Sequence, residues 1–171
     1  RKKSSFYHFG QMIPLGKIPY DDFYHYLVRG FEKKCVQKEN ISKKILEFTR
    51  AHPYYTQQLA FTVWENCSNN LPFAEQVNTA ITLLIQIHDM DYERLWQTLN
   101  PTDKKVLIAL SLQSRNILSE TVVRKYGLPA VSTVFSSLQR MMKHGYIIKT
   151  NSGYEPDDPF FAQWIKRKRD E

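Results

Sequence analysis

Apolar side chains recur at spacings of three and four residues along most of this chain, and this feature constrains the fold more than any other. Such spacing places the apolar side chains on one face of a helix, and that face must then pack against another element. Segments of this kind begin near residues 20, 41, 53, 73, 91, 101, 120 and 130. Short strand-like stretches occur only at Gln11–Leu15 and within 146–156. The sequence therefore predicts a mostly α-helical protein.

Several residues indicate where these helices begin. Pro19, Pro53 and Pro101 suit a helix start, because proline lacks the N–H group that the first turn leaves unpaired. Asp91 is expected to cap the fifth helix, and Ser119 the seventh. We expect the helix over 53–67 to bury Leu59, Phe61, Val63 and Trp64, and the helix over 130–144 to bury Val131, Val134, Phe135, Leu138, Met141 and Met142.

The last third of the chain follows a different pattern from the helical segments before it. Two helices, a turn through Gly127, a longer helix to His144 and a hairpin turning at 151–153 follow one another. This order is typical of a winged helix-turn-helix. The fold class predicted is mostly α: a helical bundle, then a winged helix-turn-helix with a small β-hairpin.

Composition excludes some classes of protein. No apolar run approaches the ~20 residues that a membrane-spanning helix needs, so we expect no membrane partner. The two cysteines, Cys35 and Cys67, are too few for a disulfide scaffold, and we interpret them as reduced thiols of a cytoplasmic protein. The net charge is +7, and the basic excess lies in residues 1–50 and 101–171 on either side of an acidic middle. This distribution favours two modules, and basic modules attract polyanions.

The sequence predicts no catalytic residues and no metal site. The five histidines do not pair at metal-binding spacing. Residues 10–17 resemble a phosphate loop only superficially. Five residues instead of four separate their glycines, and Ile18 stands where Ser or Thr must hold magnesium.

The helix Ala130–His144 is the candidate recognition helix. Small hydroxyls can bond phosphates or base edges, and Arg can read guanine. Ser137 and Gln139 are among the residues expected to face outward on this helix. The predicted DNA contacts are Ser132, Thr133, Ser136, Arg140 and Lys143, together with Lys149 on the hairpin, which is the wing of such a domain. The alternative is a winged helix that packs or contacts protein, because the first half of this helix carries no positive charge. The basic run 166–169 fits either a phosphate-binding patch or a solvated helix end.

The segment His52-Pro53-Tyr54 lies at a predicted helix start, where free N–H groups and the helix dipole favour anions. One interpretation is a nucleotide contact. The other is that Pro53 starts the helix and the aromatic residues fill the core.

Several segments in order resemble the C-terminal half of the archaeal-type P-loop ATPases, relatives of the AAA+ and STAND groups. Residues 5–18 resemble the last strand of the ATPase core and its exit, and Ala51–Leu59 resemble the family's Gly-His-Pro motif. Residues 95–110 resemble the junction into the winged helix, and Tyr154–Trp164 resemble the closing Asp-Pro-aromatic segment. The resemblance implies three parts: 1–19 as the end of the ATPase core, 20–100 as a helical lid, and 101–171 as a winged-helix domain with a C-terminal basic helix.

The resemblance also implies a cofactor and partners. His52, Pro53 and Tyr54 are expected at the edge of an ATP site, although Ala51 replaces the usual Gly. ATP is expected in the parent chain only, because the phosphate loop and Walker B acids are absent from these residues. The partners expected are the N-terminal ATPase core of the same protein and either double-stranded DNA or a protein. The alternatives are a free-standing winged-helix DNA binder with a helical dimerisation domain, and an adaptor whose winged helix contacts only protein.

Overall fold

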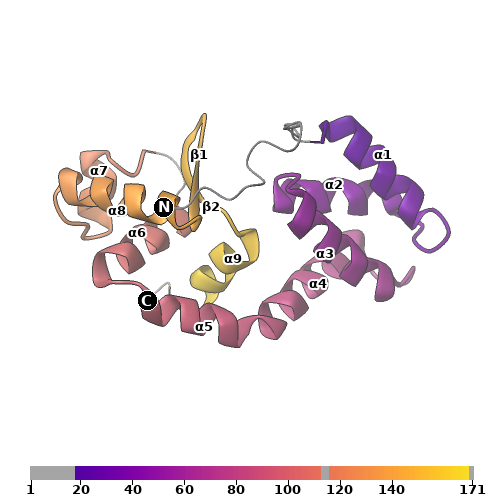
Figure 1. The fold of residues 1–171 in the computed structure, drawn as a ribbon. Coiled ribbons are helices and arrows are strands. Elements are labelled where there is room, and N and C mark those ends of the chain that lie inside the picture. Colours follow the sequence, from indigo (N-terminus) through magenta and orange to yellow (C-terminus); the bar gives the residue numbers. More distant parts are fainter. Residues whose placement is uncertain (1–17, 113–115, 170–171) are drawn as a thin grey trace, which may run out of the picture.

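The computed structural model of the 171-residue chain describes residues 18–112 and 116–169. Within them, nine helices and one antiparallel strand pair follow one another (Figure 1). The elements are α1 Tyr20–Phe31, α2 Lys38–Thr49, α3 Pro53–Glu65, α4 Phe73–Ile87, α5 Asp89–Thr98, α6 Pro101–Leu112, α7 Glu120–Lys125, α8 Val131–Lys143, β1 Ile147–Thr150, β2 Gly153–Pro156 and α9 Pro159–Lys168. The mostly α-helical fold with a small hairpin is confirmed. The strand predicted at Gln11–Leu15, and nearly all of the predicted end of the ATPase core, lie outside the described residues.

Some helix starts follow directly from the local sequence, and one predicted start does not. Pro53 and Pro159 occupy the first turns of α3 and α9. Ser119 caps α7 as predicted, since its side chain accepts a hydrogen bond from the Val122 N–H at 3.4 Å. The predicted cap at Asp91 is wrong, because α5 already begins at Asp89. Asp91 lies in the first turn, where a carboxylate also benefits from the helix dipole and so resembles a cap in sequence.

The helices α1 to α4 form a bundle with α2 at its centre. α2 packs against α1, α3 and α4, and its side chains Ile41 and Ile45 are fully buried. A hydrogen bond of 2.6 Å between the hydroxyls of Thr49 and Thr56 joins the end of α2 to α3. The apolar side chains buried around α2 belong to a core that continues through α9 into the second part of the molecule.

The helices α6 and α8 and the hairpin form the second part of the molecule. α6 packs against α8 and β2, and α8 against β1. In the hairpin, Ile147 pairs with Pro156 and Thr150 with Gly153. The chain turns from α8 into β1 at Gly145, whose φ of 74° lies in the left-handed region that glycine adopts most easily.

The C-terminal helix α9 joins the two parts. It packs against α6 and β2 on one side and against α4 and α5 on the other (Figure 1). Its residues Phe160, Trp164 and Ile165 are fully buried. The helix predicted as the basic end of the winged-helix domain is therefore also the main link to the helical bundle.

Two predicted buried faces are partly wrong. On α3, Leu59 and Val63 are buried, but Phe61 and Trp64 are exposed to solvent. On α8, the expected stripe narrows to Val134, Leu138 and Met141, while Val131 and Phe135 are each 46% exposed and Ser137, expected to face outward, is fully buried. In both helices the apolar residues cover more of the circumference than the neighbouring helices can bury.

The cysteines also differ from the prediction. Cys35, in the turn after α1, and Cys67, after the end of α3, form a disulfide with their Cα atoms 6.1 Å apart. The expectation of two reduced thiols is therefore wrong. The sequence separation of 32 residues hides the pairing, because α1 and α3 end at the same side of the bundle only after folding.

Candidate functional site

The outer face of α8 is lined by small hydroxyl side chains. Ser132, Thr133 and Ser136 are all exposed. The Ser136 hydroxyl donates to the Ser132 carbonyl of its own helix at 3.0 Å, and an exposed hydroxyl can exchange such a bond for one to a ligand. The structure therefore places three of the predicted DNA contacts together on one surface.

Arg140 lies further along α8, but its guanidinium already has a partner. Its Nε atom donates to Asp103 Oδ2 at 3.0 Å, and its Nη2 atom to Asp103 Oδ1 at 2.5 Å. Asp103, on α6, is only 4% exposed, and the buried Ser137 hydroxyl donates to the same carboxylate. The hydrogen bond to Asp103 raises the pKa of Arg140 above its ordinary value. Arg140 therefore holds α8 against α6, and only part of its donor set faces solvent.

Two other predicted cations lie free on the surface. Lys143 at the end of α8 and Lys149 on β1 are both exposed. Within residues 18–112 and 116–169, neither has an acidic side chain at ion-pair distance. An unpaired cation on an exposed surface is available to a phosphate.

Apolar side chains accompany these polar ones. Val131 and Phe135 lie one turn apart on the exposed side of α8, and Ile148 on β1 is also exposed. The first half of α8 therefore presents hydroxyls and apolar groups but no charge. That combination suits a protein surface as well as it suits DNA.

Residues 90–167 match the model of a protein family described as a probable winged helix domain. The matched range runs from α5 to α9 and supports the winged helix predicted for the last third of the chain. It starts before Pro101, and so includes most of α5, which the predicted division assigns to the lid. No curated protein and no solved structure matches the chain. The ATPase relationship is supported by the sequence resemblance alone.

The predicted nucleotide contacts lie at the start of α3, on the bundle. His52, Pro53 and Tyr54 are exposed, and the His52 ring lies 4.6 Å from that of Tyr55. Tyr54 instead meets Tyr55 edge-on at 5.3 Å. His52 and Tyr54 therefore flank Tyr55.

The backbone just before this segment is in an unusual conformation. Arg50 and Ala51 have φ angles of 55° and 53°, in the left-handed region that residues with a Cβ atom adopt at a cost. At position 51, where the family resemblance expects glycine, the backbone thus has a conformation that suits glycine.

Contacts that the sequence did not reveal connect this segment to the winged helix. The Arg50 guanidinium forms an ion pair with Glu155 on β2 and donates to the Pro156 carbonyl at 2.7 Å. The Tyr55 hydroxyl lies 3.4 Å from Asp157 Oδ2. The partners are more than a hundred residues apart in sequence, so no local pattern signals them. The end of α2 and the start of α3 are thereby fixed to the wing and to the turn that precedes α9.

A second group of contacts surrounds Asp158, the N-cap of α9. Its carboxylate accepts from the N–H groups of Phe160 and Phe161 at 2.7 and 3.1 Å, and from the Tyr92 hydroxyl of α5 at 3.0 Å. Burial raises the pKa of Asp158 above its ordinary value, although these hydrogen bonds oppose the shift. Burial also raises the pKa of Tyr92, and the charge of Asp158 adds to that effect. One side chain therefore caps α9 and attaches it to α5.

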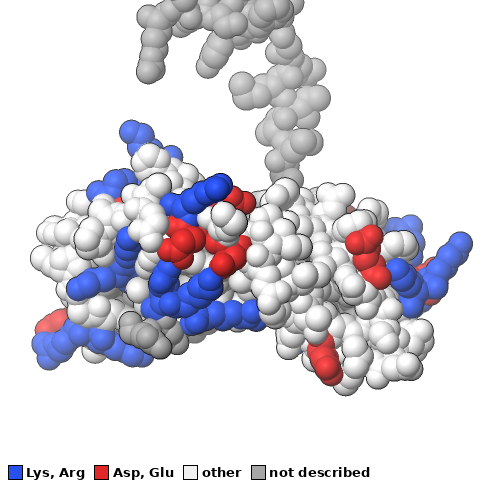
Figure 2. Space-filling view, turned by 90° about the horizontal axis from the view of Figure 1, so that it is seen from below, with Lys and Arg blue, Asp and Glu red and all other residues white. Residues whose placement is uncertain are grey.

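The basic run at the end of α9 is largely engaged within the molecule. Lys168 forms an ion pair with Asp89 at 2.5 Å, and Arg169 with Glu93 at 2.5 Å. The hydrogen bond from Lys168 lowers the pKa of Asp89. In Figure 2, basic and acidic side chains are mixed over the winged-helix half of this face, and the bundle half carries few charges. These ion pairs favour a helix end over a free phosphate-binding patch.

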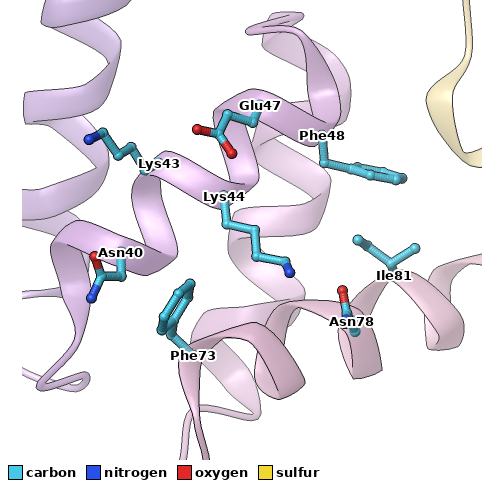
Figure 3. A pocket seen from close by; sticks show the side chains of 8 residues that line it. All are labelled: Asn40, Lys43, Lys44, Glu47, Phe48, Phe73, Asn78 and Ile81. Atoms are coloured by element: carbon cyan, nitrogen blue, oxygen red, sulfur yellow. The ribbon is translucent and has the colours of Figure 1, made fainter.

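A separate hollow of about 520 Å³ lies between α2 and α4 (Figure 3). Figure 3 shows the Lys44 side chain reaching from α2 toward Asn78 on α4, and the ring of Phe73 pointing toward α2. None of the predicted nucleotide or DNA contacts lines this hollow. Among residues 18–112 and 116–169, no group of His, Cys, Asp and Glu is arranged to hold a metal ion, and every helix is too short or too polar to cross a bilayer.

Proposed function

We propose that this chain is a regulatory binding module without catalytic residues of its own, and that its winged helix binds double-stranded DNA. The observation that carries the proposal is the surface formed by α8 and β1. The exposed hydroxyls lie on the same helix as Lys143, and Lys149 lies on β1, which packs against α8. Neither lysine has an acidic partner at ion-pair distance among the described residues. Winged helices commonly place such a helix in the major groove and the wing along the backbone.

We further propose that the bundle of α1 to α4 is the lid of a P-loop ATPase core in the same protein. The sequence resemblance supports this relationship, and so does the exposure of His52 and Pro53 at a helix start. The contacts of Arg50 with Glu155 and Pro156, and of Tyr55 with Asp157, fix the bundle to the winged helix. A movement of the lid in response to ATP or ADP therefore turns the winged helix with it as one body.

The DNA part is tested by fluorescence anisotropy of a labelled duplex at several salt concentrations. The variant Lys143→Ala/Lys149→Ala removes two unpaired cations from the proposed surface. Its matched control, Lys33→Ala/Lys43→Ala, removes two exposed lysines from the bundle. We expect the first variant to lower the dependence of log K on log salt by up to about two, since each phosphate contact contributes a slope of about one. Equal affinity of both variants contradicts binding through α8 and the wing.

A protein partner is the second candidate function, and the exposure of Val131 and Phe135 favours it. In this case the chain without substitutions binds no duplex near physiological salt. The substitution Phe135→Ser then weakens the partner contact, while circular dichroism checks that the helices remain intact.

The ATPase part is tested on the intact protein. A phosphate loop upstream of these residues supports the lid assignment, and its absence from the full gene product contradicts it. With such a core present, ATP and ADP are expected to give different DNA affinities.

A further inference from the structure

An open groove of about 950 Å³ separates α1 from α3 on the bundle, at the end of the molecule opposite α8 (Figure 1). Its α1 wall includes Asp22, Tyr26 and Arg29, which follow one another at the helical period. Its α3 wall includes Phe61 and Trp64. Both helices pack against α2 below the groove, so its walls are supported from inside the molecule.

The walls of the groove carry large exposed aromatic side chains. Tyr26 is 64% exposed, Phe61 59% and Trp64 43%. Apolar residues on the surface of a monomer are usually scattered singly, whereas aromatic residues concentrate in the contact regions of protein interfaces. The groove therefore has the character of a surface that a protein covers.

The charges on the α1 wall indicate which protein. Asp22 and Arg29 are two turns apart, about 10 Å along the helix, with Tyr26 between them. Neither has an ion-pair partner among the described residues. If two copies of α1 lie antiparallel about a two-fold axis at Tyr26, Asp22 of each copy faces Arg29 of the other. The surface is thus complementary to itself, as a two-fold interface requires.

We propose that the groove between α1 and α3 is a homodimer interface, occupied by the same face of a second copy of this chain. Tyr26 packs near the axis, and the two Asp22–Arg29 pairs flank it. Gly30 has no side chain, and no atom lies within 4 Å of the place where a Cβ atom would stand. The second copy can therefore approach the α1 backbone closely at this residue.

The far end of the groove is already held in place. The Lys34 ammonium lies 3.9 Å from the centre of the Trp64 ring and donates to the Glu65 carbonyl at 3.3 Å. The Cys35–Cys67 disulfide joins the segments that follow α1 and α3 at the same end. The groove is therefore preformed, and association does not have to order its walls.

Sedimentation equilibrium of the whole chain tests the proposal. We expect the parent to dimerise reversibly, and Asp22→Arg to weaken the dimer roughly tenfold or more, since two attractive pairs become repulsive. The double variant Asp22→Arg/Arg29→Asp reverses both signs and is expected to restore the dimer. Phe61→Ser weakens it by roughly a hundredfold, because both copies lose an aromatic contact. Ile87→Ser, which removes an equally exposed apolar side chain from α4, leaves the dimer intact.

All the substituted side chains are exposed, so we expect each variant to fold. Circular dichroism of each variant checks this. A parent chain that stays monomeric at every soluble concentration overturns the proposal. So does a dimer that survives both Asp22→Arg and Phe61→Ser. Failure of the double variant to recover association, with its helices intact, overturns the antiparallel two-fold arrangement.

Discussion

The carboxylate of Asp103 is expected to be the most sensitive polar group of the winged helix. It is nearly buried on α6 and accepts hydrogen bonds from Ser137, from two nitrogens of Arg140 and from the Asn100 side chain at 2.8 Å. The substitution Asp103→Ala removes the acceptor from all of these donors. Ser137 and Arg140 both lie on α8, so the change loosens the packing of α8 against α6 directly.

The size of the effect follows from how exposed each donor is. The Ser137 hydroxyl is fully buried, and leaving it unpaired costs about 1–2 kcal/mol. Arg140 is 43% exposed, so solvent replaces much of its ion pair and its share falls to about 1 kcal/mol. Asn100 is exposed and adds about 0.5 kcal/mol. We therefore expect Asp103→Ala to lower the free energy of unfolding by about 3 kcal/mol, a large effect for a single substitution.

Urea unfolding followed by circular dichroism measures this loss, and the chain contains a matched control. Arg124 and Glu120 on α7 form an ion pair at 2.8 Å in which both side chains are more than 80% exposed. Arg124→Ala is expected to cost less than about 0.5 kcal/mol. If Asp103→Ala costs no more than Arg124→Ala, the reasoning from burial is refuted.

The same network bears on how DNA-binding experiments are interpreted. Arg140→Ala leaves the Asp103 carboxylate buried with fewer hydrogen-bond donors. The substitution therefore disturbs the packing of α8 against α6 even if Arg140 never contacts DNA. A double-mutant cycle with Asp103→Ala is expected to give a coupling of about 1 kcal/mol. An affinity loss caused by Arg140→Ala alone therefore does not identify a base contact, whereas Lys143 and Lys149 are free of this ambiguity.

Three further predictions concern the segment between α2 and α3, its contact with β2, and the N-cap of α9. Ala51→Gly is expected to raise the free energy of unfolding by up to about 1 kcal/mol in urea unfolding, because glycine relieves a φ of 53°, whereas Ala60→Gly within α3 lowers it by about 1 kcal/mol. Arg50→Ala is expected to cost about 1–2 kcal/mol and to speed amide exchange in the wing, since the Pro156 carbonyl and Glu155 lose a donor. Because the pKa of Asp158 is raised, the folded state binds the proton of this carboxyl more tightly than the unfolded state does. The contribution of Asp158 to the free energy of unfolding therefore increases as pH falls from the folded pKa toward the unfolded pKa of about 4. The stability difference between the parent and Asp158→Asn is therefore expected to grow in favour of the parent on acidification; an unchanged or shrinking difference contradicts the raised pKa.

The sequence predicts the helices of this protein well, but it predicts their outer faces poorly. The period of Val134, Leu138 and Met141 identifies α8 and its buried side, because a helix that packs on one neighbour needs only this stripe. Phe135 belongs to the same apolar pattern, and its exposure depends on where α6 and the hairpin end. Phe61 on α3 is misassigned for the same reason. Periodicity therefore shows that a helix is amphipathic, but it does not show how much of the apolar face is covered.

The candidate site is only partly predictable for a second reason. Ser132, Thr133 and Lys149 are identified correctly as exposed, because their positions follow from local structure. The engagement of Arg140 by Asp103 and of Arg50 by Glu155 arises from contacts 37 and 105 residues apart, which leave no trace in spacing or composition. Tertiary partners therefore decide which basic residues are free to bind a ligand.

The two proposals meet in one consequence for DNA recognition. Figure 1 places α1 and α8 at opposite ends of the molecule, and α9 packs against both parts between them. A dimer formed through α1 and α3 therefore carries two winged helices at a fixed separation, which favours DNA with two half-sites over DNA with one. Asp22→Arg, which lies far from α8, is then expected to lower affinity for a two-site duplex by about tenfold or more and to leave affinity for a one-site duplex unchanged. An equal loss on both duplexes contradicts the link, because it means that the substitution acts on the winged helix itself and not on the pairing of two copies.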